Sequence, residues 1–418
     1  MDQETRERIR INNEKGIIRE SGGGFHSPLE SAVRHMFYTA WSGRYECNRI
    51  YSVRREHLDF YSVIYVLEGQ LEVEYEGKIL QVRQNEAVLL DFHKPHAYRA
   101  VSDRVDKWEM LFKGNESAAW GVDNPENPYL PAWTKVLSEA HQAGYTAIEL
   151  GPYGYMPIDP VVVAEELEKN QLAIVAGTIF HDLVDPANQP SVLEAVDNIC
   201  KLITDDRLPK LPVLEGQKFP TPYMTVMDWG HDERDFNAGH VDRAPRMNAE
   251  EWKQFLGHVR AVCERANSWG VRPVIHPHSG TYIEFSDEIA RYVQDMPYEI
   301  AGLCLDTGHL YYCDMDPVTY LKKYADVLDY VHFKDVDQKV YEQVMSEHIR
   351  FFDGCGKGTM CPVGTGALDY PGIKTALEEI GYSGYITIEQ ERDPRNQETS
   401  LRDIKASVDY LKSVGYQI

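Results

Sequence analysis

The 418-residue sequence lacks several features that would each indicate a class of protein. No apolar stretch approaches the roughly 20 residues of a membrane-spanning helix, and the first residues, MDQETRERIRINNEKG, are too polar for a signal peptide. No Cys-x-x-Cys pair occurs among the seven cysteines, so neither a zinc ribbon nor a disulfide framework is indicated. We therefore expect a cytoplasmic protein with reduced thiols and no membrane partner.

Basic residues are scarce relative to acidic ones. The chain has 43 Lys and Arg against 66 Asp and Glu, which gives a net charge of −23. Proteins that bind nucleic acids draw most of their affinity from neutralising phosphates, so this charge argues against a DNA or RNA partner. The hydrophobic content of 43% is typical of a globular protein, and the length suits two domains better than one core.

The first quarter of the chain reads as closely spaced strands. Residues 60–100, FYSVIYVLEGQLEVEYEGKILQVRQNEAVLLDFHKPHAYRA, alternate β-branched and aromatic residues with polar ones, and the turn signals LEG and YEGK interrupt them. This pattern predicts a small all-β barrel or sandwich over residues 30–114. Residues 1–29, which include SGGGF, are predicted to be a tail.

Strand and helix patterns alternate over residues 115–418. The eight predicted strands are 118–122, 146–150, 173–180, 222–228, 273–278, 301–306, 329–335 and 384–391, each followed by a helical pattern. Helices are expected to end at Gly144, Gly270 and Gly381. Eight such units in about 300 residues predict an α/β fold, a (β/α)₈ TIM barrel.

Polar residues recur where these predicted strands end. They are Glu149, His181, Asp228, His276, His278, Asp306, His309, His332, Lys334, Glu389 and Glu391. A single His or Asp in such a place is more often structural, but the strand ends of this fold converge on one mouth. Four successive ends carry a nitrogen or oxygen ligand, at His276, Asp306, His332 and Glu389. Two imidazoles and two carboxylates suit a divalent transition metal such as Mn²⁺, Co²⁺ or Zn²⁺.

Four motifs carry a resemblance that covers residues 118–418. They are VIHPHSGTYIE, LCLDTGHLYY, DYVHFKDV and VGTGALDYPGIKTALEEIGYSGYITIEQERDP. They resemble the xylose-isomerase-like barrel superfamily, and within it the inosose dehydratase branch. The resemblance implies metal ligands at the same four positions, with Mn²⁺ or Co²⁺ expected and Zn²⁺ or Mg²⁺ as alternatives. His276 stands where the epimerase branch has a glutamate, which argues against the two-glutamate epimerase mechanism.

A site of this kind predicts proton abstraction beside the carbonyl of a keto-sugar or keto-inositol. His309, His278 or Lys334 would be the base, and Glu391 is the candidate acid; Glu149, His181 and Asp228 are expected to line the substrate pocket. Dehydration, a lyase reaction, is favoured. The alternatives are epimerisation or isomerisation, elimination-type cleavage of a 3-keto-glycoside, and sugar sensing without catalysis.

Residues 30–114 resemble the cupin-type sensor domain of arabinose-responsive regulators. The resemblance rests on YSVIYVLEGQLEVEYEGK, NEAVLLDFHKPHAY and WEMLFKG. The first stretch lacks the histidines of metal-binding cupins, and His96 with nearby His93 remains from the second, so no metal is expected there. A ligand pocket, a structural role and dimerisation all stay open for this domain, as does a homodimer or higher oligomer for the chain.

Residues 354–359, GCGKGT, suggest a phosphate-binding loop only superficially. Gly follows Lys357 where such a loop needs Ser or Thr, and no strand–loop–helix spacing fits. The segment is predicted to be a glycine-rich loop, a candidate flap over the site.

Overall fold

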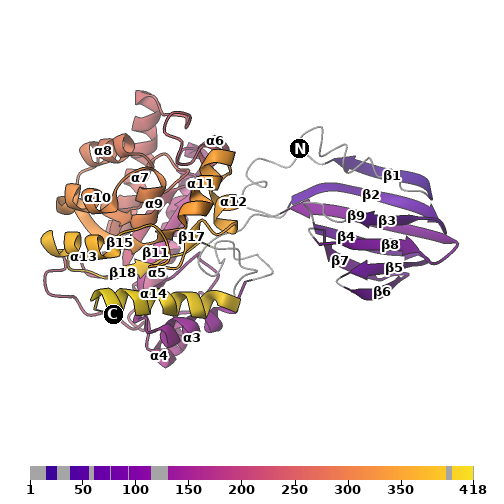
Figure 1. Ribbon diagram of the computed structural model, residues 1–418, viewed down its shortest axis with the longest axis horizontal. Coiled ribbons are helices and arrows are strands. Elements are labelled where there is room, and N and C mark those ends of the chain that lie inside the picture. The colour runs from indigo at the N-terminus through magenta and orange to yellow at the C-terminus, as the bar shows by residue number, and fades with distance from the viewer. Residues whose placement is uncertain are drawn as a thin grey trace. The chain divides into compact units, whose positions relative to one another are not determined.

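A computed structural model describes residues 16–25, 38–55, 61–75, 77–92, 94–113, 130–391 and 398–417 (Figure 1). The chain divides into two compact units, Met1–Asn115 and Glu116–Ile418. Across the described ranges, none of the helices combines the length and the apolar character that crossing a membrane requires.

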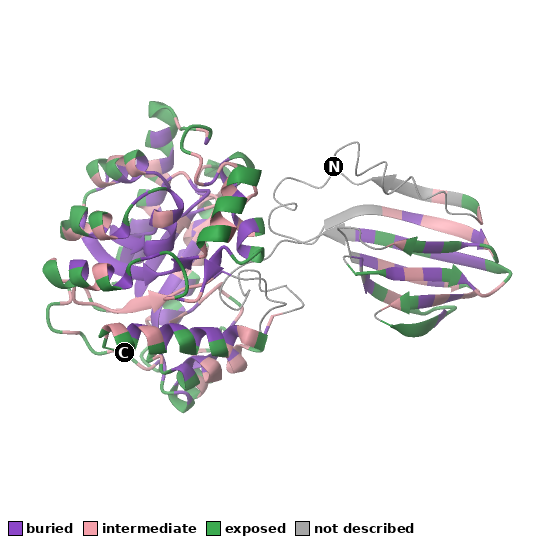
Figure 2. Cartoon of the chain, viewed as in Figure 1, coloured by how far each residue is buried: buried purple, intermediate pink, exposed green. Residues whose placement is uncertain are grey.

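The first unit consists of two antiparallel sheets. One has the order β1 (Ile17–Phe25), β2 (Tyr38–Asn48), β9 (Arg104–Lys113), β4 (Tyr61–Glu68) and β7 (Ala87–Asp91); the other has β3 (Ser52–Arg55), β8 (His96–Ala100), β5 (Gln70–Tyr75) and β6 (Lys78–Arg83). Strand residues alternate between the interior and the surface, as in β5, where Leu71 and Val73 are buried. One apolar cluster contains residues of both sheets (Figure 2). These sheets fit the predicted cupin-like domain.

The second unit has a parallel sheet at its centre. Its order is β10 (Ala147–Glu149), β11 (Ala173–His181), β12 (Tyr223–Asp228), β13 (Arg272–Ile275), β14 (Gly302–Asp306), β15 (Leu328–Phe333) and β18 (Ile386–Ile388). The flanking helices are α3 (Trp133–Ala143), α4 (Pro160–Lys169), α5 (Gln189–Ile203), α6 (Asp232–Phe236), α7 (Ala249–Ser268), α8 (Ser286–Asp295), α9 (Thr307–Tyr312), α10 (Pro317–Lys323), α11 (Gln338–Glu347), α12 (Phe351–Gly356), α13 (Tyr370–Glu379) and α14 (Ser400–Val414). This nearly closed parallel barrel confirms the predicted fold class.

The predicted first strand of the barrel, residues 118–122, lies outside the described residues. The seven strands that are described follow one another in the sheet in chain order, from β10 to β18. An eighth strand of a closed barrel would lie between these two edge strands. Its presence there stays a prediction.

Local signals in the sequence explain where the barrel's helices begin and end. Asn248 caps α7 by accepting hydrogen bonds from the backbone N–H groups of Glu250 and Glu251. Gly144 caps the C-terminus of α3 with φ of 94°, a left-handed conformation that favours glycine, as predicted. The helices flanking the barrel are therefore largely readable from the sequence.

The prediction of a loop at residues 354–359 was wrong in its first half. Helix α12 continues through Gly356, and the turn begins only at Lys357. Phe351 and Cys355 are buried, and a Cβ at Gly354 would come within 3.1 Å of the Val344 methyl groups. Close packing against α11 thus outweighs the low helix propensity of glycine.

The inside of the barrel has its own small apolar cluster. It consists of Val175, Ala176, Tyr223, Val274, Cys304 and Tyr330. Cys304 and Tyr330 come two residues before Asp306 and His332, so the period of a strand places them on the same inward face. This apolar cluster lies one side-chain layer below the polar strand ends.

Candidate metal centre and acid–base site

The four predicted metal ligands come from four neighbouring strand ends. His276 follows β13, Asp306 ends β14, His332 lies near the end of β15, and Glu389 follows β18. One ligand atom from each of them can be chosen so that all four lie within 4.8 Å of one another. The two imidazoles and Asp306 are buried and Glu389 is half-buried. The structure therefore brings together the side chains that the sequence singled out.

The two oxygens of Asp306 have different surroundings. Oδ1 caps α9 by accepting hydrogen bonds from the backbone N–H groups of Gly308 (2.7 Å) and His309 (2.9 Å). Oδ2 lies 3.8 Å from His276 Nε2 and 3.4 Å from Lys334 Nζ. Among the described residues, neither Asp306 Oδ2 nor His276 Nδ1 has a hydrogen-bond partner. Buried polar atoms in this state are suited to binding a cation.

Lys334 places a fully buried ammonium among three carboxylates. Its Nζ lies 2.5 Å from Glu391 Oε1, 3.4 Å from Asp306 Oδ2 and 3.5 Å from Glu389 Oε2. Burial alone would lower the pKa of Lys334, but the three carboxylates raise it above its usual value. For the acidic group Glu389 the signs are reversed. Burial would raise its pKa, but Lys334 and His332 lower it to about 2.

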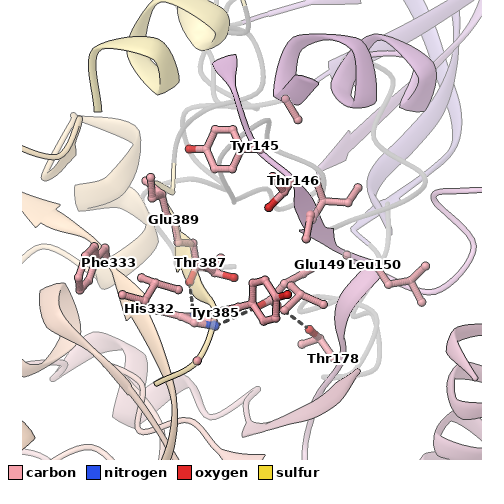
Figure 3. Close-up of a pocket in the computed structure, with 18 of the residues that line it drawn as sticks. Tyr145, Thr146, Glu149, Leu150, Thr178, His332, Phe333, Tyr385, Thr387 and Glu389 are labelled. Carbon is pink, nitrogen blue, oxygen red and sulfur yellow. Dashed lines mark hydrogen bonds and ion pairs between the residues drawn. The ribbon is translucent and has the colours of Figure 1, made fainter. Parts of the chain in front are cut away.

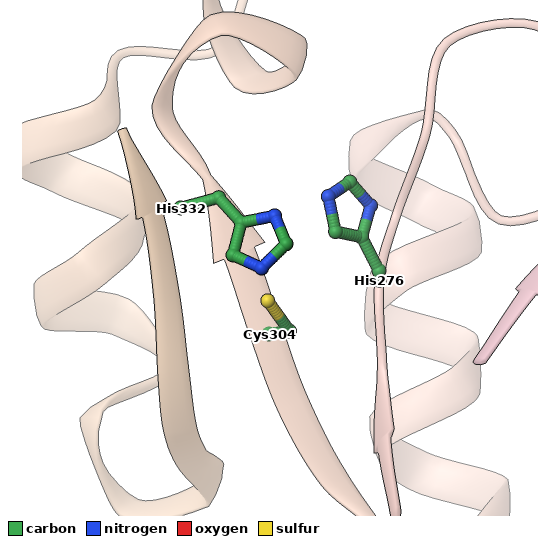
Figure 4. A group of neighbouring side chains, drawn as sticks. All are labelled: His276, Cys304 and His332. Atoms are coloured by element: carbon green, nitrogen blue, oxygen red, sulfur yellow. The ribbon is translucent and has the colours of Figure 1, made fainter. Parts of the chain in front are cut away.

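His332 lies between two carboxylates. Its Nδ1 is 2.9 Å from Glu389 Oε2, and its Nε2 is 2.8 Å from Glu149 Oε1 (Figure 3). Burial would lower the pKa of His332, but Cys304 and Glu149 raise it well above its usual value. Cys304 lies beside His332 and His276 (Figure 4), and burial raises the pKa of its thiol to about 11.

The charge balance of the site fits a divalent cation. The pKa values of Glu149, Asp306, Glu389 and Glu391 are all lowered, because burial, which would raise them, is outweighed by neighbouring cations. Lys334 and His332 are the cations, since the pKa of His276 is lowered by burial. Four carboxylates against these two cations leave a negative excess, which grows by one charge when His332 gives up a proton to bind a metal, and a divalent ion would offset much of it. Two imidazoles and two carboxylates are ligands that Mn²⁺, Co²⁺ and Zn²⁺ accept.

A second cluster adjoins the first and contains His278, His309 and Glu391. His278 Nδ1 lies 2.8 Å from the carbonyl oxygen of Ser279, to which it can donate, and this leaves a lone pair on Nε2. His309 Nε2 accepts from Lys334 Nζ at 2.8 Å, and its Nδ1 lies 3.0 Å from Ser279 Oγ. Burial, with His278 and Lys334, lowers the pKa of His309 to about 3. Ser279 thus contacts both imidazoles, and Lys334 also contacts His309.

A cavity of about 980 Å³ opens beside both clusters. The predicted residues that line it are Glu149, His181, His278, His332, Glu389 and Glu391. Phe180 and Phe352 also line it, with ring centroids 5.6 and 6.2 Å from that of His278. The same cavity continues between the edge strands β10 and β18, past Tyr145 and Tyr385 (Figure 3). We take only the end next to His278 and His332 as substrate space, because an eighth strand is predicted at the other end.

Asp228 lies apart from this cavity. Its Oδ1 accepts from the backbone N–H of Leu183 (3.1 Å) and lies 2.9 Å from His231 Nε2, and its Oδ2 accepts from the backbone N–H of Tyr282 (3.3 Å). Asp182 completes this cluster with Asp228 and His231. Asp228 thus ties together loops that follow β11, β12 and β13, and a role in substrate binding stays a prediction.

Sequence reasoning missed several residues that shape the site. Cys304 and Tyr330 could have been found, since they precede Asp306 and His332 by two residues. Ser279, which contacts His309, and Thr178, which donates to Glu149, gave no comparable signal. These two contacts join side chains from different strands and loops, so they follow from the folded structure and leave no pattern in the sequence.

Comparison with known proteins supports both parts of the fold. The model of the family described as xylose isomerase-like TIM barrel matches residues 137–414, and that of the AraC-like ligand binding domain matches residues 41–112. The structure of the probable 3-DHS dehydratase AsbF from Bacillus anthracis is similar with a TM-score of 0.51 and 15% identity, covering 69% of this chain and 95% of that one. At that identity the similarity concerns the fold alone.

Curated relatives include proteins named inosose dehydratase. That of Lacticaseibacillus casei is 33% identical over 172 residues, which are 41% of this chain and 58% of the relative, so this match spans little more than half the relative's length. That of Geobacillus kaustophilus is 34% identical over 268 residues, covering 62% of this chain and 80% of the relative. The rhizopine catabolism protein MocC of Rhizobium meliloti is 28% identical over 258 residues, covering 62% and 74%.

Proposed function

The chain belongs to the xylose isomerase-like TIM barrel family, and from that premise we propose that it is a divalent-metal-dependent dehydratase of a keto-inositol or related keto-polyol. The observation that carries this proposal is the juxtaposition of two clusters at one cavity. Four ligand side chains with a negative charge excess lie beside a group of histidines, a lysine and a carboxylate. The relatives named inosose dehydratase support the substrate class.

His276, Asp306, His332 and Glu389 would hold the metal ion, with Mn²⁺ or Co²⁺ as our first choice. Such an ion, when bound, supplies a Lewis acid that polarises the substrate's carbonyl and acidifies the neighbouring C–H bond. Because His276 stands where a carboxylate would complete an epimerase-type pair, the ligand set carries two negative charges instead of three. This replacement favours dehydration over epimerisation.

His278 is the best placed base among the three candidates. It lines the cavity, whereas His309 and Lys334 are absent from the described residues that line it. The hydrogen bond from Nδ1 to the Ser279 carbonyl leaves Nε2 free to accept a proton. Phe180, Trp229 and Phe352 surround the ring with centroids 5.6, 5.9 and 6.2 Å away and limit the access of water.

Lys334 and Glu391 form the proton-donating pair. Burial would raise the pKa of Glu391, but Lys334 lowers it well below its usual value, so the transferable proton resides on Lys334. In the dehydration, His278 takes the proton from the carbon next to the carbonyl, and its electron pair forms the new C=C bond. The hydroxyl on the next carbon leaves as water with a proton delivered by Glu391, which lines the cavity and receives that proton from Lys334. Glu391 holds the ammonium in place at 2.5 Å.

The cell compartment proposed for this reaction is the cytoplasm. All seven cysteines are free thiols in buried positions, which suits a reducing environment. The proposed partner is a small carbohydrate substrate.

Proton NMR in D₂O tests the proposed reaction. Metal-stripped and Mn²⁺- or Co²⁺-loaded protein would be incubated with 2-keto-myo-inositol, ketohexoses and 3-keto-glucosides. We expect metal-dependent loss of water from the keto-inositol, with a dione as the product. An epimer or a released aglycone as the metal-dependent product would overturn the dehydratase assignment, and failure to bind either metal would overturn the metal site.

A further inference from the structure

Glu149 is held rigidly at the end of β10 by residues from two other strands. Tyr330 of β15 donates to its Oε1 at 2.9 Å, and Thr178 of β11 donates to its Oε2 at 3.3 Å. The remaining close partner is His332, whose Nε2 lies 2.8 Å from Oε1. Glu149 lines the cavity, but only 18% of its side chain is exposed, so these three contacts account for most of its surroundings.

The imidazole of His332 separates Glu149 from the metal-ligand cluster. Its other nitrogen, Nδ1, lies 2.9 Å from Glu389, which belongs to that cluster. Glu149 itself is absent from every group of three or more described His, Cys, Asp and Glu residues whose ligand atoms all lie within 4.8 Å of one another. One nitrogen of the ring therefore faces the metal position, and the opposite nitrogen faces Glu149.

We propose that Glu149 is a positioning residue for the metal ligand His332. Its Oε1 lies 2.8 Å from His332 Nε2, an ion-pair distance that would favour a proton on Nε2, leave the lone pair of Nδ1 for the metal and raise the basicity of that nitrogen. Thr178 and Tyr330 keep the carboxylate in the required orientation. This inference rests on the proposed metal site and assigns Glu149 a role other than substrate contact.

Substitution of Glu149 separates the two roles. In Glu149→Gln, the affinity for Co²⁺ or Mn²⁺, measured by competition with a chelator, should fall about 10- to 100-fold. The absorption spectrum of the Co²⁺-loaded variant should differ from that of the wild type. KM for the keto-inositol should stay near the wild-type value once the metal is saturating, because the proposed role of Glu149 acts through His332.

Two further variants complete the experiment. Thr178→Val removes one hydrogen bond to the Glu149 carboxylate and should weaken metal binding less than tenfold, with Thr178→Ser restoring it. If Glu149→Gln does not fold, the metal affinities of Thr178→Val and Thr178→Ser test the positioning role in its place. Glu165→Gln, at an exposed position of α4, is the matched control and should leave metal affinity and KM unchanged.

The outcomes distinguish this inference from the proposed function. If the wild type binds metal and Glu149→Gln binds it equally well, the positioning role is refuted and the metal site stands. A raised KM at saturating metal with unchanged metal affinity would instead make Glu149 a substrate-binding residue. If the wild type binds neither Mn²⁺ nor Co²⁺, the metal site and the positioning role are refuted together.

Discussion

Each of the two units buries a lysine ammonium against carboxylates, and the ratio of charges differs between them. In the first unit, Lys107 pairs with Glu109, which also accepts from Tyr98 at 3.0 Å. The rings of Tyr45, Tyr51 and Tyr98 surround the ammonium, with centroids 5.0 to 5.1 Å away. In the barrel, Lys334 faces three carboxylates, two of which (Asp306 and Glu391) each keep an oxygen without a hydrogen bond among the described residues.

This difference in charge ratio distinguishes an ion cluster that only stabilises the fold from one that can bind a metal cation. In the first unit the one carboxylate, Glu109, has Lys107 and nearby Arg55 as cations, and aromatic rings and a hydroxyl as further partners, so its negative charge is neutralised from within. The barrel cluster leaves negative charge that its own residues do not neutralise. We interpret that excess as the signature of a cation site.

The largest effect is expected from removing one negative charge in the barrel cluster. Asp306→Asn keeps an oxygen that can cap α9 and loses the carboxylate that faces His276 and Lys334. Dehydratase activity should fall about 10⁴-fold or more, since both metal affinity and transition-state stabilisation are lost. Asp242→Asn, whose side chain is 76% exposed, is the control and should retain full activity. Appreciable turnover by Asp306→Asn without metal would contradict the proposed site.

Breaking the balanced pair of the first unit should affect stability and leave metal binding unchanged. Lys107→Met leaves the Glu109 carboxylate buried without its cation and should destabilise the first unit by about 3–5 kcal/mol. Hydrogen exchange at β4 and β9 in the full chain would measure the loss. The double variant Lys107→Met/Glu109→Gln should recover most of it. A drop in metal affinity in either variant would show that the two clusters do not have separate roles.

Within the barrel, His278→Ala should separate proton transfer from metal binding. We expect activity to fall about 10²- to 10³-fold because the base is lost. Metal affinity should stay at the wild-type value, since His278 belongs to a different group of side chains from the four ligands. Steady-state kinetics and a chelator competition measure the two quantities. Weakened metal binding would instead identify His278 as a ligand.

Two other buried carboxyls should give pH dependences of opposite sign. Glu284 shares buried Arg234 with Glu288, which also pairs with Arg246 at 2.6 Å, and burial raises the pKa of Glu284 from 4.5 to about 7. A raised pKa gives stabilisation that is present below pH 4.5 and lost as pH rises through 7. Burial would also raise the pKa of Glu109, but Lys107 lowers it below 4.5, so its stabilising contribution is lost as the pH falls.

Comparison of the wild type with Glu284→Gln and Glu109→Gln measures these contributions. The free energy of unfolding of the wild type relative to Glu284→Gln should decrease between pH 5 and 7, by at most about 1.4 kcal/mol per pH unit. Relative to Glu109→Gln it should decrease as the pH falls below 4.5. The same sign for both differences would contradict the pKa shifts assigned to the two carboxyls.

Much of this arrangement was predictable because the carboxyl ends of parallel strands converge. The strand-end positions of His276, Asp306 and Glu389 follow from the alternation of strands and helices. The partner that each side chain faces depends on strand register and rotamer, so the pairing of Glu149 with His332 was not predictable. The same limit applies to Asp228, which contacts loop backbone.

The most direct test of the account is the location of bound metal in a crystal of the full chain. Anomalous scattering from Mn²⁺-soaked crystals should show a peak among His276, Asp306, His332 and Glu389, with no peak beside Lys107 and Glu109. The absence of a peak in the barrel, or a peak in the first unit, would contradict the claim that unbalanced buried charge marks the functional site.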